Sequence, residues 1–219
     1  MVATVSPPEA EDAGHWVQLA WNEDKQRAAH GVDRFLITET RFGVAGDTAT
    51  WDAAPVWEQF RMWVLQPVAF GASGLLFWSG NRWHGGHWPH WGGLLDRTGQ
   101  PEPDFPWGMQ MGELFEKWGK KLLEAPVLSS AAILTDFDQR AALQVYPHTA
   151  SSKQLLGEAF DLLHRLGIGT DTIPLVNVQK KDLLRKYALL VLAADSALDG
   201  KPAATLKRLG KGTVIRVHL

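Results

Sequence analysis

The hydrophobic pattern along the chain switches repeatedly between a strand period and a helix period. Segments with apolar positions three or four residues apart predict helices at residues 15–30, 51–70, 107–123, 151–166 and 201–209. Short apolar or alternating runs predict strands at residues 34–39, 73–79, 131–135, 170–175, 189–193 and 212–217. Strands that alternate with helices predict an α/β protein built on parallel sheets.

The distribution of tryptophan indicates that the chain has two parts. All 11 tryptophans lie between Trp16 and Trp118, and none follows Trp118. A long segment rich in Gly, His, Trp and Pro, residues 80–106, also belongs to this first part. We therefore predict two domains, residues 1–124 and 125–219.

Composition and charge exclude several classes of function. The 22 Lys and Arg residues nearly balance the 24 Asp and Glu residues, which gives a net charge of −2 and a pI of about 6.4. General nucleic-acid binding needs a basic surface, so we expect no nucleic-acid partner. The chain has no run of 18 apolar residues, so we expect no membrane span. It has no cysteine, which excludes disulfides, zinc–thiolate sites and cysteine nucleophiles.

Candidate chemistry lies where the first two predicted strands end. Glu39 is the last residue of the first predicted strand, where a fixed and partly desolvated carboxylate suits a nucleophile or a proton carrier. A structural alternative is that Glu39 pairs with Arg41 or Arg61, or meets solvent. Phe77 and Trp78 stand at the end of the second strand, where aromatic faces could stack on sugar rings or simply pack in the core.

The segment 83–91 combines three histidines at a spacing of three, His84, His87 and His90, with three tryptophans. Histidines at this spacing suggest a metal site. Intervening Gly and Pro residues exclude a regular helix, however, and the cluster contains no carboxylate. A polyhydroxylated ligand fits better, because imidazoles exchange hydrogen bonds while indoles stack, and we expect no metal.

Three stretches resemble the last third of the catalytic barrel of glycoside hydrolase family 42, the bacterial β-galactosidases. These are LITET (36–40), QPVAFGASGLLFWSG (66–80) and WGGLLDRTGQPEP (91–103). They are similar to the family's strand seven, its passage into strand eight and the exit from strand eight. Ser73 stands where the family has Asp. Residues from about 131 onward resemble the family's middle, trimerisation domain, so the resemblance covers about four fifths of the chain.

The resemblance implies a fold and a set of roles. It implies the last strands of a (β/α)8 TIM barrel, followed by a flavodoxin-like parallel α/β domain similar to class I amidotransferases. Glu39 matches the nucleophile of a retaining enzyme. Trp51 matches a galactose-subsite tryptophan, Phe77 and Trp78 an aromatic platform, and His87 and His90 a sugar-binding Glu-x-x-His motif that has lost its Glu. The implied partners are a galactoside and further copies in a cytoplasmic homotrimer, with no cofactor.

The length of the chain limits this hypothesis. A complete barrel takes roughly 250 residues, and we predict only two barrel strands before residue 118. Asn22 and Glu23 resemble the acid/base pair but stand too close to Glu39, in the preceding helix. We therefore expect a chain that carries the nucleophile without its acid and is inactive alone. The alternatives are a non-catalytic carbohydrate-binding or assembly module and, third, a metalloprotein built on the histidine-rich loop.

Overall fold

The computed structural model describes residues 13–29, 33–44, 54–86, 90–135, 152–174, 184–193 and 213–217. The chain divides into two compact units. Unit 1 comprises residues 1–15 and 34–127, and unit 2 comprises residues 16–33 and 128–219. Most of the first helix, α1 (Ala13–Ala29), therefore belongs to unit 2 rather than to the part of the chain that surrounds it in the sequence.

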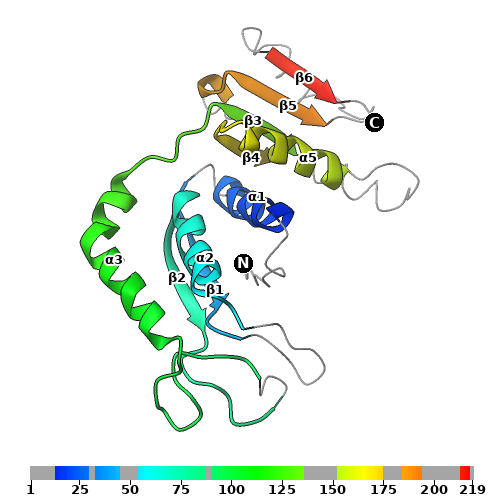
Figure 1. Ribbon diagram of the computed structural model, residues 1–219. Coiled ribbons are helices and arrows are strands. Elements are labelled where there is room, and N and C mark those ends of the chain that lie inside the picture. The colour runs from blue at the N-terminus through cyan, green and yellow to red at the C-terminus, as the bar shows by residue number, and fades with distance from the viewer. Residues whose placement is uncertain are drawn as a thin grey trace. The chain divides into compact units, whose positions relative to one another are not determined.

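Unit 1 is built on two parallel strands that pair directly with each other. One helix crosses between them, and a longer helix follows the second strand after an extended loop (Figure 1). Phe35, Ile37 and Ala72 form a small hydrophobic cluster in the sheet. The elements are β1 (Phe35–Arg41), α2 (Trp57–Ala69), β2 (Ala72–Trp78) and α3 (Phe105–Glu124).

Helix α2 buries one face because its large apolar residues recur at helical spacing. Phe60, Trp63, Val64 and Pro67 are the buried positions of this helix. At its start, the backbone N–H of residue 56 donates to the Gln59 side chain, which satisfies one of the free amides of the first turn. The ring of Phe60 also lies close to Trp107 of α3, with centroids 5.8 Å apart, so the two helices pack side by side.

Arg34, just before β1, fastens the end of α3 to the sheet. Its guanidinium donates to the carbonyls of Leu122 (3.1 Å) and Leu123 (2.7 Å) and to that of Ala125. These carbonyls have no partner within the helix, and a cation is favourable at the negative end of the helix dipole. The contact joins the segment just before β1 to the end of α3.

Unit 2 contains a four-stranded, fully parallel sheet in the order β4-β3-β5-β6. Helix α5 packs on β3, β4 and β5. All four residues of β3 that precede Thr135 are buried, as expected for a strand with neighbours on both sides. The remaining bounds are β3 (Ala131–Thr135), α5 (Ser152–Arg165), β4 (Thr170–Pro174), η2 (Leu184–Lys186), β5 (Leu189–Ala193) and β6 (Thr213–Val217).

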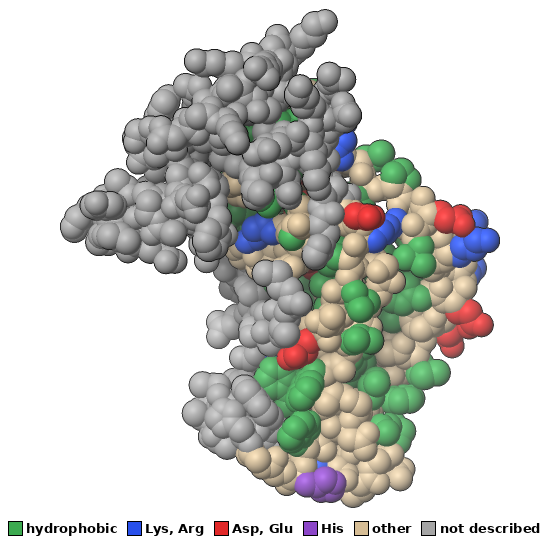
Figure 2. All heavy atoms as spheres, turned by 180° about the vertical axis from the view of Figure 1, so that it is seen from behind, with side chains coloured by type: hydrophobic (Ala, Val, Ile, Leu, Met, Phe, Trp, Pro, Cys, Tyr) green, Lys and Arg blue, Asp and Glu red, His purple; other side chains and the backbone are tan. Residues whose placement is uncertain are grey.

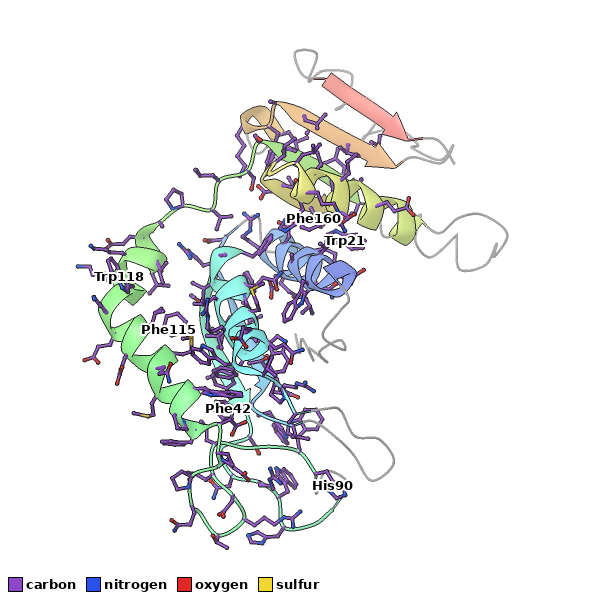
Figure 3. The ribbon with its side chains drawn as sticks, viewed as in Figure 1. Trp21, Phe42, His90, Phe115, Trp118 and Phe160 are labelled. Carbon is purple, nitrogen blue, oxygen red and sulfur yellow. The ribbon has the colours of Figure 1, made fainter. Side chains whose placement is uncertain are left out.

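Helix α1 covers the outer edge of β4. The backbone N–H of Thr172 donates to Asp24 Oδ2 (2.6 Å), and the Trp21 indole donates to the Thr172 hydroxyl (3.2 Å). Figure 3 shows Trp21 close to Phe160 of α5, and their ring centroids are 6.4 Å apart. An uncovered strand edge would expose unpaired backbone groups, so α1 completes unit 2.

Asp171, on β4, is the centre of a buried polar network. Its carboxylate accepts hydrogen bonds from Arg27, Ser129 and Tyr187, and Lys186 Nζ lies 3.0 Å from Oδ2. Burial alone would raise the pKa of Asp171, but these hydrogen bonds and the Arg27 charge outweigh burial and hold it below its usual value. Burial, and next the bond to Asp171, raise the pKa of the Tyr187 hydroxyl.

The structure confirms the prediction of an α/β chain with parallel strands. Strands β3 and β5 have the predicted bounds, and the other described strands differ from the prediction by one or two residues at their ends. The predicted helix at 201–209 lies outside the described residues. Within the described residues, none of the helices combines the length and apolar character that a membrane span requires.

Candidate active site

The carboxyl ends of β1 and β2 lie side by side, because the two strands are parallel neighbours. The chain segments that leave both strands gather at this end of unit 1 (Figure 1). In parallel α/β folds this end is where binding and catalytic side chains are presented. The positions of the predicted site residues in the first part of the chain are therefore described relative to these strand ends.

Glu39 is half-buried near the end of β1 at an irregularity of the strand pair. Ile37 pairs with Leu75 and Thr40 with Phe77, so β1 has one extra residue between these two pairs. Such a bulge changes the direction of the side chains in it and is common next to functional sites. The strand continues to Arg41, two residues beyond its predicted end, so Glu39 is held by strand backbone on both sides.

The two arginines considered as partners of Glu39 both lie over tryptophan rings of α2. The Arg41 guanidinium is 4.5 Å from the Trp63 ring centroid, and that of Arg61 is 5.8 Å from the Trp57 ring centroid. Arg41 is buried, and its contact with α2 anchors the end of β1 to the helix layer. These contacts give no support to the structural alternative in which Glu39 forms an ion pair with Arg41 or Arg61.

Phe77 and Trp78 have different surroundings. The Phe77 ring lies edge-on to Phe42 (5.5 Å) and stacks on Phe60 (6.0 Å), so it belongs to the aromatic cluster between β2 and α2. Trp78 stacks on Trp83, with centroids 5.6 Å apart, and both rings are partly exposed. Trp78 therefore offers a ring face near the strand end, whereas Phe77 also serves packing.

Two glycines, Gly92 and Gly93, tie the long loop to the ends of both strands. Gly92 N–H donates to the Val44 carbonyl (2.6 Å), after β1, and a Cβ at Gly92 would lie 2.7 Å from the Phe42 carbonyl oxygen. A Cβ at Gly93 would lie 2.9 Å from the backbone nitrogen of Arg82, after β2. Only glycine permits such close approach of two backbones. The pair stands in the stretch WGGLLDRTGQPEP (91–103), where two adjacent glycines are the signal in the sequence that marks it.

The loop also packs through its own polar groups. The Trp91 indole donates to the Trp78 carbonyl (3.1 Å), and Arg82 forms a salt bridge with Glu102 (2.9 Å). Asp104, half-buried, lines a cavity of about 270 Å³ with Gly92, and burial raises the pKa of its carboxyl. Sequence reasoning missed Asp104, because nothing around it in the sequence indicates that its carboxyl is partly buried.

The histidines are only partly described. His90 is half-buried in the loop region beyond the strand ends (Figure 3), and His84 is exposed. His87 and Trp51 lie outside the described residues, so their predicted roles stay predictions. Within the described part of the chain, no group of three His, Asp or Glu side chains is arranged to hold a metal ion.

Comparison with solved structures identifies the fold. The chain superimposes on the β-galactosidase of Bacillus circulans sp. alkalophilus with a TM-score of 0.82 over 98% of its residues, at 20% sequence identity. The match to the enzyme of the psychrophilic Marinomonas ef1 has a TM-score of 0.79, covers 94% of the chain and has 20% identity. A GH42 β-galactosidase from G. stearothermophilus matches with a TM-score of 0.77 over 98% of the chain, at 16% identity.

The expected resemblance to family 42 is therefore confirmed at the level of fold. The chain spans only 31–32% of the length of these three structures. No family model and no curated protein matches the sequence itself.

Proposed function

We propose that the chain is the nucleophile-bearing segment of a retaining glycoside hydrolase that cleaves terminal β-D-galactosides. The observation that carries this proposal is the place of Glu39. It is a half-buried carboxylate at a bulge near the carboxyl end of β1, beside the end of β2, in a fold that matches family 42 enzymes. A fixed carboxylate at the end of a parallel strand is what a glycosidase nucleophile needs.

In the proposed reaction, Glu39 attacks the anomeric carbon and forms a covalent glycosyl–enzyme. A second carboxyl group, about 5–5.5 Å away in retaining enzymes, protonates the leaving oxygen and then activates water to release the sugar. We place this acid outside the 219 residues. Glu23 is not it, because its helix position packs with unit 2.

The other predicted site residues take binding roles in this proposal. Trp78 supplies a ring face for the apolar side of the sugar, with Trp83 stacked behind it. His90 exchanges hydrogen bonds with sugar hydroxyls, and His87, Trp51 and Phe77 complete the subsite. A neutral imidazole accepts one hydrogen bond where a carboxylate accepts several, so the preferred sugar or linkage differs from that of enzymes with the Glu-x-x-His motif.

The architecture proposed for the whole enzyme follows the same resemblance. Residues 1–124 supply the last strands of a TIM barrel, and residues 125–219 form a flavodoxin-like domain that joins three copies of a cytoplasmic enzyme. The all-parallel order β4-β3-β5-β6 supports the second assignment, because the second strand of the sheet lies outside the first as in flavodoxin-like sheets. The boundary at residue 124 falls at the last residue of α3.

A trapping experiment tests the role of Glu39. The reagent is 2,4-dinitrophenyl 2-deoxy-2-fluoro-β-D-galactoside, whose leaving group departs without a proton and so needs no acid from the enzyme. We expect mass spectrometry to find one fluoro-galactosyl group on the peptide that contains Glu39. Glu39→Gln abolishes the label, and Glu58→Gln, at an exposed carboxylate of α2, keeps it. A label on any other residue contradicts the proposal.

One observation favours a second candidate, a non-catalytic carbohydrate-binding module. Trp78, Trp83 and Trp91 lie together at the end of β2, and Trp83 is 41% exposed. Aromatic faces of this kind bind sugars without any chemistry. Galactose-dependent quenching of tryptophan fluorescence that is lost in Trp83→Ala, together with no covalent label at Glu39, would favour this candidate.

A further inference from the structure

The cavity of about 270 Å³ beside Asp104 is formed by the segments that follow β1 and β2 and by the start of α3. Small-molecule sites typically measure about 300–1,000 Å³, so a cavity just below this range suits a ligand of one ring. Its charged lining residues are Arg82, Glu102 and Asp104, and Trp107 gives it an aromatic wall. The proposed reaction of Glu39 does not use this cavity.

Asp104 stands at the start of α3 but does not cap the helix. An aspartate at this position normally accepts a hydrogen bond from an amide of the first turn, whereas the Asp104 side chain forms no such bond. Its carboxyl lies against Gly43, where a Cβ would be only 2.7 Å from Asp104 Oδ2. Gly43 has a φ of 76°, a left-handed conformation that glycine adopts without strain. The glycine therefore makes room for the carboxyl on the cavity wall.

The half-buried carboxyl of Asp104 forms no salt bridge among the described residues. Arg82, the only cation in the described lining, is paired with Glu102 at 2.9 Å. Burial raises the pKa of Asp104, and the charge of Glu102 adds to the rise. In the space-filling view, few charged side chains reach the surface at the lower end of unit 1 on the face shown (Figure 2). A bound cation would relieve the cost of keeping this carboxylate partly out of water.

The ion pair of the cavity is held in place by the backbone. Arg82 N–H donates to the Leu95 carbonyl (2.9 Å), and Glu102 N–H donates to the Leu94 carbonyl (3.1 Å). Two adjacent residues of one segment therefore position both members of the pair. Polar groups that are fixed in advance bind a ligand without a further cost of ordering.

Trp107 is fixed as well. Its ring centroid lies 6.0 Å from that of Trp57 and 5.8 Å from that of Phe60, both on α2. Pro55 and Pro103 are further apolar residues of the lining. An indole face packs on the apolar face of a sugar ring and also attracts cations. The cavity therefore combines a wall for a ring with a carboxylate for a positive charge.

We propose that this cavity binds an amino sugar whose protonated amine pairs with Asp104 and whose ring lies against Trp107. Hydroxyl groups of the sugar bond to Arg82 and Glu102. A neutral sugar would leave the Asp104 carboxylate without a cation, and an anionic sugar would meet two carboxyl groups. The site goes beyond the proposed function, since it needs neither Glu39 nor the acid outside the 219 residues.

Calorimetric titration with D-glucosamine tests the proposal, with D-glucose as the uncharged counterpart. The two sugars differ at one position, where glucose has a hydroxyl in place of the amine. At about pH 6.5, where the amine is protonated, we expect glucosamine to bind at least about tenfold more tightly, because a hydrogen bond between two charged groups is stronger than one between neutral groups. Equal affinities of the two sugars, or no binding of glucosamine, would overturn the proposal.

A matched pair of variants tests the role of the Asp104 charge. Asp104→Asn keeps the shape of the side chain and removes its charge, whereas Glu113→Gln removes the same charge from an exposed position of the same helix. We expect Asp104→Asn to weaken glucosamine binding at least about tenfold and Glu113→Gln to leave it unchanged. Equal effects of the two variants would contradict the assignment.

Amide NMR spectra locate the bound sugar without any substitution. Gly43, Gly92 and Gly93 line this cavity, and Gly112 and Gly119 do not. Glucosamine should shift the amide signals of the first three glycines and leave those of the other two in place. Shifts that spare all three lining glycines would place the sugar elsewhere and overturn the proposal.

The same titrations separate this site from the proposed catalytic subsite. Glu39→Gln should bind glucosamine as tightly as the parent chain does, because the amine pairs with Asp104. If Glu39→Gln lost the binding while Asp104→Asn kept it, glucosamine would occupy the catalytic subsite, and the cavity would not be its site. A failure to trap a glycosyl group at Glu39 contradicts the proposed function and leaves the glucosamine result standing.

Discussion

At the scale of single residues, the carboxyl group with the largest change of pKa among the described residues is one that the candidate site does not use. Glu23, on α1, is 6% exposed, and its Oε2 has no hydrogen-bond partner within the described residues. Burial raises its pKa from 4.5 to about 9. At neutral pH this carboxyl is therefore protonated in the folded protein, a state that is compatible with a packing role.

The pKa of Glu23 predicts that the protein loses stability as pH rises. Between pH 4.5 and about 9 the folded state keeps the proton and the unfolded state releases it, so ionisation favours unfolding. At 1.4 kcal/mol per pKa unit, the loss reaches about 3 kcal/mol at pH 7. Glu23→Gln should remove this slope, so that the variant is about as stable as the parent near pH 5 and clearly more stable near pH 8.

Urea unfolding followed by circular dichroism across this pH range measures the effect. Asp24, whose pKa burial raises to about 6, keeps a smaller slope in the acid range in both proteins. Glu58→Gln, at an exposed position, is the control and should follow the parent. An unchanged slope in Glu23→Gln would show that Glu23 ionises normally in the folded protein.

The network around Asp171 predicts the opposite pH dependence, a loss of stability as pH falls. Asp171→Asn removes a buried negative charge and leaves Arg27 and Lys186 without it, which should destabilise the protein by about 3–5 kcal/mol near pH 7. Because the pKa of Asp171 is lowered in the fold, its stabilisation is present above the unfolded pKa of about 3.8 and is lost as pH falls.

The surface pair of Asp161 with Arg165 provides a control for this prediction. Asp161→Asn should change the free energy of unfolding by less than about 1 kcal/mol, because exposed ion pairs contribute little. Both variants are compared by urea unfolding. If Asp171→Asn cost no more than Asp161→Asn, the buried network would not stabilise unit 2.

At the scale of elements, the candidate site depends on how the long loop is fastened to the two strands. Gly92→Ala puts a methyl group 2.7 Å from the Phe42 carbonyl oxygen, so one backbone segment must move. We expect a loss of roughly 1–3 kcal/mol and slower trapping at Glu39. Gly85→Ala, where a Cβ meets nothing within 4 Å, should do neither. Similar behaviour of the two variants would show that the loop is not held at Gly92.

The strands and helices could be predicted because each depends on a local pattern. The apolar runs at 131–135 and 189–193 predicted β3 and β5 with their bounds, since a central strand is buried on both faces and reads as a continuous apolar run. The end of β1 was harder to predict. Thr40 and Arg41 are polar, yet they are buried in the strand, because Arg41 packs on Trp63.

Long-range pairing is what the sequence could not provide. Helix α1 precedes β1 in the sequence but packs on β4, through Asp24 and Thr172, which are 148 residues apart. No local pattern encodes such a contact. The strand ends did identify Glu39 and Trp78 as candidates, whereas the bulge at Glu39 and the backbone contacts of Gly92 depend on pairings that only the folded chain reveals.

At the scale of the whole molecule, the proposed separation of the nucleophile Glu39 from its acid has a kinetic consequence. Without the acid, the departing oxygen leaves as an anion, so the rate of attack by Glu39 depends steeply on the acidity of the leaving group. The isolated chain should therefore hydrolyse ordinary nitrophenyl galactosides negligibly. Dinitrophenyl galactoside, whose leaving group needs no proton, should release that group measurably in the first turnover.

Restoring the acid should remove this difference. In a protein that combines this chain with the acid-bearing part, first-turnover release of the poorer leaving group should speed up at least about a hundredfold, the typical range for a general acid, and first-turnover release from dinitrophenyl galactoside should change much less. Single-turnover rates for a series of aryl galactosides, in the 219-residue chain and in the combined protein, measure the effect. Glu39→Gln is the control and should be inactive throughout. Normal turnover of nitrophenyl galactoside by the isolated chain, abolished in Glu39→Gln, would place the acid within these 219 residues.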